Sequence, residues 1–187
     1  MKSAVGMFFM SCLLFFRGNS QDIPSTVQSN YIYGLPTDIG KKVFISQGYK
    51  GWFSHKKQYA LDFKLKEGSS VFAAREGIVF KVAAHNTEGG MRKKYLSKGN
   101  YIIIRHLDGT YAAYWHLKHN GVSVEIGQEV SRGDKIGESG NTGYSTSAHL
   151  HIEVYFINEK GNQVTFPTVF QTSKGTKKLR SYRFYRR

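Results

Sequence analysis

Cysteine, proline and acidic residues are all scarce in this sequence of 187 residues. The chain has a single Cys, Cys12, which excludes an internal disulfide framework. It has only 3 Pro beside 20 Gly, and 40% of its residues are hydrophobic, a composition that excludes collagen-like and disordered chains. The 12 Tyr and 13 Phe supply enough aromatic surface to fill a core. We therefore expect one folded domain without disulfides.

Long hydrophobic runs are also missing, apart from one short run at the start. Residues 4–16 read AVGMFFMSCLLFF, and thirteen residues are fewer than the roughly 20 that a membrane-spanning helix needs. Lys2 precedes the run and the small residues GNS follow it, which is typical of a secretory signal peptide. We expect residues 1–20 to be a signal peptide, and the mature protein to be exported to the periplasm or beyond with no spanning segment. A buried helix or a short membrane anchor is the alternative.

Acidic residues are too few to balance the basic ones, which leaves a net charge of +14. Half of this charge lies in a basic tail at residues 173–187, SKGTKKLRSYRFYRR, which holds seven Lys or Arg and no acid. Such a segment attracts anionic polymers without sequence selectivity. Because we expect export, an anionic envelope polymer is the natural partner, and nucleic acid is not. The alternative is a solvated, frayed terminus.

Segments with a helical period are rare after residue 40, and turn signals recur roughly every 8–15 residues instead. This pattern favours an all-β fold, which we place at residues 41–172 after an irregular lead-in at 21–40. The clearest feature is a hairpin whose turn is Asp108-Gly109, a dipeptide suited to positive φ. We expect a monomer with strands at 43–46, 70–74, 78–84, 100–106, 110–117, 149–157 and 163–166, and short β segments within 127–137.

Two histidines lie close together in the strand His-Leu-His-Ile-Glu-Val, which begins at His149. Side chains alternate across a strand, so His149, His151 and Glu153 share one face while the apolar residues between them can pack into the core. Two imidazoles at i and i+2 present their nitrogens to a common point, which favours a metal site. A solvated sheet face is the alternative.

Further candidate ligands occur in other segments. Asp62 lies in the apolar segment YALDF, where a carboxylate is costly unless it is exposed or liganded. His55 precedes Asp62 by seven residues and lies in a Gly-rich turn. In the second strand of the hairpin, alternation places His116 on the face of Tyr114 and opposite Leu117. Several strands thus place an acid or imidazole opposite an apolar face, as a preorganised site requires.

Four segments occur in a fixed order within residues 44–156: ISQGYKGWFSHKKQYALDF, VFAAREGIVFKV, GNYIIIRHLDGTYAAYWHLKHNG and GQEVSRGDKIGESGNTGYSTSAHLHIEVYF. Together they resemble the LytM or lysostaphin-type zinc metallopeptidases of family M23. The resemblance implies mainly antiparallel β-sheets that form an open groove, and peptidoglycan peptides as substrate. It also implies that Zn²⁺ is bound by His55, Asp62 and His151, and that His116 and His149 are catalytic.

Two features depart from the usual pattern of this family. The gap between His55 and Asp62 is longer than the common HxxxD spacing. Ser147-Ala148 stands before the HxH, where Gly-Pro is frequent, so the groove wall is expected to differ. The long polar loop at 85–99, which carries four Lys or Arg, is expected to form another wall.

The chemistry of this residue set can be stated without the family. Two imidazoles and one carboxylate leave the fourth position of a tetrahedral Zn²⁺ open for water. The chain has no HExxH motif, so the usual helix-borne glutamate base is absent. His116 and His149 would therefore hold the water, accept its proton or bind the developing oxyanion.

Three other functions compete with a secreted zinc endopeptidase. A catalytically inactive LytM-like domain that binds the cell wall or regulates a partner would keep the fold, but every expected polar residue is present. A non-haem Fe(II) oxygenase also uses two His and a carboxylate, but it leaves two further His unexplained. A lipoyl- or biotin-type carrier needs a modifiable Lys in a short hairpin motif, and Asp134-Lys135-Ile136 is the only near match.

The remaining polar candidates receive structural interpretations. His106 ends a predicted strand and is expected to form a structural hydrogen bond. His85 and His119 lie in polar segments and are expected to be solvated. Asn100 and Tyr144 either line the groove or occupy turn and surface positions.

Overall fold

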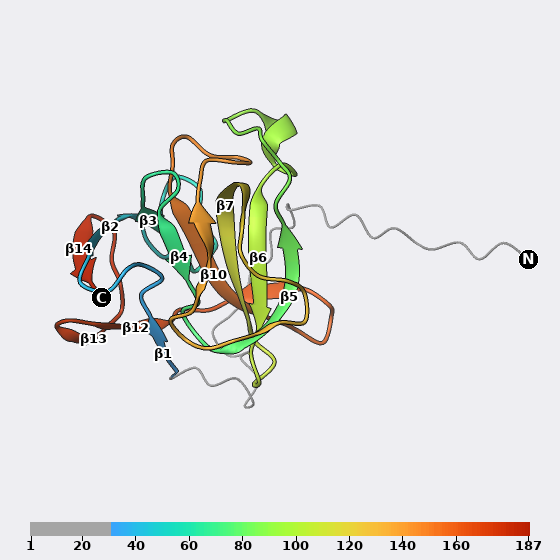
Figure 1. The fold of residues 1–187 in the computed structure, drawn as a ribbon. Coiled ribbons are helices and arrows are strands. Elements are labelled where there is room, and N and C mark those ends of the chain that lie inside the picture. The colour runs from blue at the N-terminus through green and yellow to red at the C-terminus, as the bar shows by residue number, and fades with distance from the viewer. Residues whose placement is uncertain (1–30) are drawn as a thin grey trace, which may run out of the picture.

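The computed structural model describes residues 31–187, so the predicted signal peptide at 1–20 lies outside the described residues. Within this range the chain forms 14 strands and one short 3-10 turn at Lys93–Tyr95, with no α-helix (Figure 1). The prediction of an all-β fold with mainly antiparallel sheets is confirmed. No helix among the described residues is long and apolar enough to cross a membrane.

The strands form one large sheet and one small sheet. In chain order they are β1 (Ile32–Gly34), β2 (Lys42–Gln47), β3 (Ala60–Lys64), β4 (Ser70–Phe72), β5 (Gly77–Ala83), β6 (Asn100–Arg105), β7 (Tyr111–Val122), β8 (Glu129–Val130), β9 (Lys135–Ser139), β10 (Leu150–Ile157), β11 (Gln163–Thr165), β12 (Val169–Thr172), β13 (Gly175–Lys177) and β14 (Arg183–Arg186). The main path of the large sheet is β14-β2-β3-β10-β7-β6-β5-β8, and β11, β4 and β9 join it at the side. The small sheet has the order β1-β12-β13.

The predicted hairpin is present as β6 and β7. Its turn contains Asp108 and Gly109, and Gly109 has a φ of 79°, which a residue without Cβ adopts at little cost. Strand β7 runs on to Val122, beyond the predicted end at 117, because its second half pairs with β9.

The main core lies on one face of the central strands β3, β10 and β7. Leu61 and Phe63 on β3 and Ile152 on β10 are at most 2% exposed. Burying each such side chain stabilises the fold by about 1.5–3 kcal/mol. Because side chains alternate, the opposite face of β3 and β10 carries Asp62 and His151. A rigid apolar layer therefore supports the polar residues that the sequence singled out.

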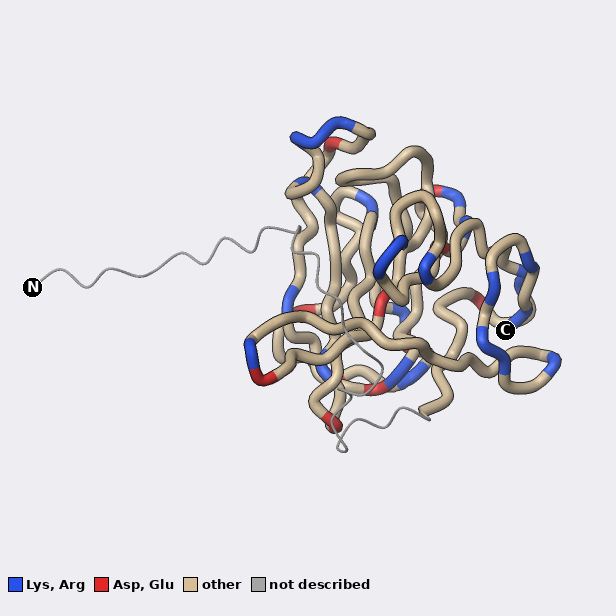
Figure 2. The backbone as a smooth tube through the Cα atoms, turned by 180° about the vertical axis from the view of Figure 1, so that it is seen from behind, with Lys and Arg blue, Asp and Glu red and all other residues tan. Residues whose placement is uncertain are grey.

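The basic C-terminal segment belongs to the sheet. Strand β14 pairs antiparallel with β2, so that Arg183 lies opposite Ile45 and Phe184 opposite Phe44. Leu179 is 2% exposed and packs in the core cluster. The alternative of a frayed terminus is therefore wrong, because Arg183–Arg186 pair with the otherwise open edge of β2. Figure 2 shows Lys and Arg gathered along the segment close to the C-terminus.

Part of the predicted irregular lead-in is also a strand. β1 pairs in parallel with β12, which places Tyr33 beside Phe170. Tyr33 is 1% exposed, and the centroids of the two rings are 5.9 Å apart. Both ends of the described chain therefore contribute side chains to the main core, Tyr33 from one end and Leu179 from the other.

Candidate metal centre and active site

Two neighbouring strands bring an acid and an imidazole together. Asp62 on β3 lies opposite His151 on β10, in a stretch of regular antiparallel register. The Oδ1 atom of Asp62 is 2.9 Å from Nδ1 of His151. Asp62 is only 8% exposed, so this carboxylate is held largely away from water.

His55 reaches the same point from the loop between β2 and β3. Its Nε2 is 3.2 Å from Nδ1 of His151 and 3.3 Å from Oδ1 of Asp62. Its Nδ1 lies 3.2 Å from the carbonyl of Gly48. Because a carbonyl only accepts, Nδ1 carries the hydrogen and Nε2 directs a lone pair into the site. Gly48 donates its N–H to Oγ of Ser181 at 2.9 Å, which ties the loop to the C-terminal segment.

The three atoms fit one face of a zinc coordination tetrahedron. The distances between Nε2 of His55, Oδ1 of Asp62 and Nδ1 of His151 are 3.2, 3.3 and 2.9 Å. Zinc bonds of about 2.0–2.1 Å in tetrahedral geometry require ligand atoms roughly 3.3 Å apart. Two imidazole nitrogens and a carboxylate oxygen are also a donor set typical of catalytic zinc. These residues can therefore hold Zn²⁺ and would leave one position for water or substrate.

His116 enters the pocket through a β-bulge. The register of β6 and β7 skips His116, and its φ of 65° lies in the left-handed region. This conformation costs a residue with a Cβ about 1–2 kcal/mol. Leu117 consequently packs in the core with Tyr114, while His116 lines the pocket. The prediction that His116 shares the face of Tyr114 opposite Leu117 is wrong, because one extra residue reverses the alternation.

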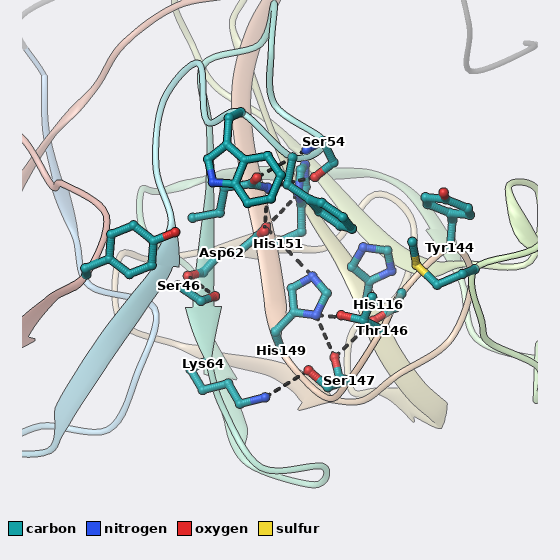
Figure 3. A pocket seen from close by; sticks show the side chains of 16 residues that line it. Ser46, Ser54, Asp62, Lys64, His116, Tyr144, Thr146, Ser147, His149 and His151 are labelled. Atoms are coloured by element: carbon teal, nitrogen blue, oxygen red, sulfur yellow. Dashed lines mark hydrogen bonds and ion pairs between the residues drawn. The ribbon is translucent and has the colours of Figure 1, made fainter.

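His116 and His149 present the same ring nitrogen to the pocket. Nδ1 of His116 lies 2.8 Å from the carbonyl of Thr142, and Nδ1 of His149 lies 2.7 Å from the carbonyl of Ser147. Each Nδ1 therefore carries a hydrogen and each Nε2 is an acceptor. The two ring centroids are 4.6 Å apart, and Nε2 of His149 is 3.7 Å from Oδ1 of Asp62. Figure 3 shows both rings beside His151.

The charge states of these side chains follow from burial and from their neighbours. Burial, with repulsion from His149 and His151, lowers the pKa of His116 to about 3. Burial also lowers the pKa of His149. Both rings are therefore neutral at pH 7 and can accept a proton. Burial acts to raise the pKa of Asp62, but hydrogen bonds with His151 and His55 outweigh it and hold that pKa well below its usual range.

Gln47 is a site residue that the sequence did not single out. Its Nε2 donates to Oδ2 of Asp62 at 3.1 Å and to Oγ of Ser54 at 2.7 Å. Its Oε1 accepts the N–H of Ser54 at 3.2 Å. The amide thus fixes the outer carboxylate oxygen and the residue before His55. A bulge at Ser46 shifts the register of β2 and turns Gln47 toward Asp62, and short sequence patterns carry no signal for such a bulge.

A pocket opens onto this cluster, and its walls come from several segments. The loop at 85–99 was expected to form a wall of the groove, and Met91 from this loop lines the pocket. Tyr144 lines it as well. Trp52 and Tyr182 also line it, and they are 73% and 65% exposed, so they stand at its mouth. Its serine and threonine side chains are those of Ser46, Ser54, Ser145, Thr146 and Ser147.

The other polar candidates stabilise the fold or face solvent. Asn100 is fully buried and holds the backbone of Asn86 through two hydrogen bonds of 2.9 Å, so it does not line the pocket. Nδ1 of His106 donates to the carbonyl of Glu76 at 2.7 Å, which confirms its structural role, and burial lowers the pKa of His106 to about 4. His85 and His119 are exposed, as expected.

Comparison with known proteins extends this description. The sequence model of peptidase family M23 matches residues 56–165, which is more than half of the chain. His55, Gln47 and the C-terminal segment lie outside the matched residues, although they contact the site or line its pocket.

Relatives of known name match part of the chain. The peptidoglycan DD-endopeptidase ShyA of Vibrio cholerae is 37% identical over 93 residues, which cover 50% of this chain and 19% of that protein. The glycyl-glycine endopeptidase ALE-1 of Staphylococcus capitis is 31% identical over 117 residues, which cover 63% of this chain and 30% of that protein. The chain thus spans less than a third of the length of these relatives.

A solved structure has the same fold. A variant of the catalytic domain of the prophage-encoded M23 protein EnpA from Enterococcus faecalis aligns with a TM-score of 0.52 and 20% identity, over 70% of this chain and 93% of that one. At this identity the likeness concerns the fold alone.

Proposed function

Because this chain belongs to peptidase family M23, we propose that it is an exported, zinc-dependent endopeptidase that hydrolyses peptide bonds in peptidoglycan stems or cross-links. The observation that carries the proposal is the triangle formed by His55, Asp62 and His151, whose edges of 2.9–3.3 Å suit zinc. Two relatives named as peptidoglycan or glycyl-glycine endopeptidases support the substrate class.

The proposed mechanism divides the work between the ion site and two neutral histidines. His55, Asp62 and His151 would hold Zn²⁺, which supplies Lewis-acid polarisation of a carbonyl and activation of water when bound. His116 and His149 face the same space with unprotonated Nε2 atoms, so they can accept a proton or donate one back after accepting it. Backbone carbonyls fix both rings through Nδ1, which removes the cost of orienting them during the reaction.

The export and the surface properties of the protein are further parts of this proposal. The proposed signal peptide at residues 1–20 would deliver the enzyme to the compartment that contains its substrate. The C-terminal segment, with its seven basic residues, would bind an anionic envelope polymer. The protein would act as a monomer. Binding to such a polymer should weaken as salt is raised, because exposed charges are screened. Unchanged cosedimentation with the polymer between low and high salt would count against this part.

Digestion of purified peptidoglycan, with and without a chelator, tests the function. We expect soluble fragments whose masses identify a cleaved peptide bond, and we expect chelator to abolish them and added zinc to restore them. His116→Ala is the matched control, since it leaves the three candidate ligands in place. Zinc-loaded protein that releases no fragment from any peptidoglycan would instead favour a LytM-like domain that binds the wall without cleaving it.

A further inference from the structure

One cation lines the pocket among the described residues. Lys64 lies two positions after Asp62 on β3, so both side chains project from the same face of the strand. Asp62 is the only acid in the pocket lining, and His151, His55 and Gln47 already contact it. Apart from a metal ion held by His55, Asp62 and His151, the positive charge that the pocket offers to an incoming ligand is therefore that of Lys64.

A serine holds this cation beside a candidate catalytic histidine. Nζ of Lys64 donates to Oγ of Ser147 at 2.9 Å. The carbonyl of Ser147 accepts the hydrogen of His149 Nδ1 at 2.7 Å. Figure 3 shows Lys64 reaching Ser147 next to His149. Ser147 belongs to the Ser-Ala pair that departs from the family's frequent Gly-Pro, and a glycine there would lack the hydroxyl that accepts from Lys64.

Lys64 has unused capacity for an anionic ligand. Among residues 31–187 its contact is the hydrogen bond to Ser147, and no carboxylate lies within ion-pair distance of it. An ammonium group has three donors, so two remain available in the open part of the pocket. Hydrogen bonds between an ammonium and a carboxylate are about twice as strong as neutral ones.

We propose that Lys64 binds a carboxylate of the substrate peptide and makes the enzyme select acidic stem peptides over their amidated forms. This inference rests on the proposed function, because it names the substrate class of the same site. An amide can still accept a hydrogen bond from Lys64 through its carbonyl, but it lacks the charge. Because Lys64 is solvent-exposed, we expect the preference to be modest, about tenfold.

The test compares two peptides that differ at one group. The intact peptide that spans the bond identified in the wild-type digest is synthesised with a free carboxylate near that bond and, separately, with a carboxamide at that position. We expect wild-type kcat/KM to favour the acid about tenfold at low salt, and the ratio to shrink as salt rises. Lys64→Met should bring the ratio to about one by lowering kcat/KM on the acid more than on the amide, and Lys64→Glu should reverse the ratio.

Matched variants separate charge recognition from structure. Lys66→Met removes an exposed lysine just beyond β3 that does not line the pocket, and it should keep the wild-type ratio. Lys64→Arg should also keep the ratio, because it retains the charge. If Lys64→Met slowed cleavage of both peptides equally, Lys64 would merely position Ser147 and His149, and the proposal would be overturned.

A binding measurement separates this proposal from the proposed function. Affinities of zinc-loaded wild-type and Lys64→Met protein for the acid and amide peptides can be obtained by calorimetry, whether or not the peptides are cleaved. If no peptidoglycan is cleaved, the acid and amide peptides are instead synthesised as two forms of one stem peptide, with a free carboxylate in the first and a carboxamide in the second. Tighter binding of the acid that depends on Lys64 supports the proposal even if the endopeptidase activity is refuted. Equal affinity of wild-type protein for both peptides overturns it even if the activity is established.

Discussion

The site is assembled from two kinds of backbone. Asp62 and His151 lie opposite each other on adjacent strands in regular register, and this register brings their side chains to a 2.9 Å contact. His55 and His116 instead come from a loop and from a bulge with a φ of 65°. The sheet therefore supplies the rigid half of the site. Irregular backbone brings His55 and His116 to it, at some cost in conformational energy.

Side-chain hydrogen bonds hold the loop of His55 in place, and one of them also reaches the regular half of the site. Gln47 links the loop of His55 to the carboxylate of Asp62, and Ser181 links the start of that loop to the C-terminal segment. The two halves should therefore respond differently to mutation.

Removal of a strand-borne ligand should abolish the metal site. Asp62→Ala or His151→Ala takes one of three candidate ligands from a rigid register, where no neighbour can replace it. We expect zinc affinity to fall by more than the 10–100-fold typical of losing an outer-shell partner, with loss of activity. Calorimetric zinc titration measures this. Glu153→Gln, on the same face of β10, is the control, and wild-type affinity in either ligand variant would refute the assignment.

Removal of a pocket histidine should spare the metal and stop turnover. In His116→Ala the three candidate ligands remain, but a neutral acceptor is lost, so we expect kcat/KM on a cleaved peptide to fall about 10²–10⁴-fold. His149→Ala should behave alike. Metal analysis of the purified variants should show bound zinc as in the wild type. His119→Ala changes an exposed residue on the same strand and serves as control, and cleavage by His116→Ala at the wild-type rate would disprove the catalytic assignment.

Loss of the link between loop and carboxylate should weaken the site in part. Gln47→Ala leaves all three candidate ligands but frees Oδ2 of Asp62 and Ser54, so we expect zinc affinity to fall about 10–100-fold. Zinc competition with a chromophoric chelator reports the change. Ser46→Ala is the comparison, since its hydroxyl contacts the carbonyl of Asp62 rather than its carboxylate. If both variants bound zinc equally well, Gln47 would have no positioning role.

The bulge should show the smallest effect, on stability. At a φ of 65°, alanine carries a steric cost that glycine avoids, so His116→Gly should be more stable than His116→Ala by about 1 kcal/mol. Both variants lack the imidazole, so their difference isolates the backbone. Urea unfolding of the two proteins measures it. Equal midpoints and slopes would mean that the bulge relaxes once the ring is gone.

The sequence was a good guide where structure follows local pattern. Alternation in HLHIEV placed His151 opposite the core residues of β10, and the Asp108-Gly109 turn located the hairpin, because both signals depend on a few neighbouring residues. The position of Asp62 beside His151 depends on which strands pair, and the family resemblance supplied that information.

The sequence was a poor guide where one extra residue changes a register. Alternation put His116 on the wrong face, and nothing pointed to Gln47, because the bulges at His116 and Ser46 depend on pairing between distant segments. The basic composition of residues 173–187 left a frayed terminus open as an alternative, but the open edge of β2 offers Arg183–Arg186 a backbone partner that no local pattern reveals.

The zinc site can be tested by a crystal structure of the zinc-loaded protein, with anomalous diffraction measured across the zinc absorption edge. We expect one anomalous peak about 2.0–2.1 Å from Nε2 of His55, Oδ1 of Asp62 and Nδ1 of His151. A crystal grown with zinc that shows no peak at these atoms, or a peak held by other side chains, would contradict this expectation.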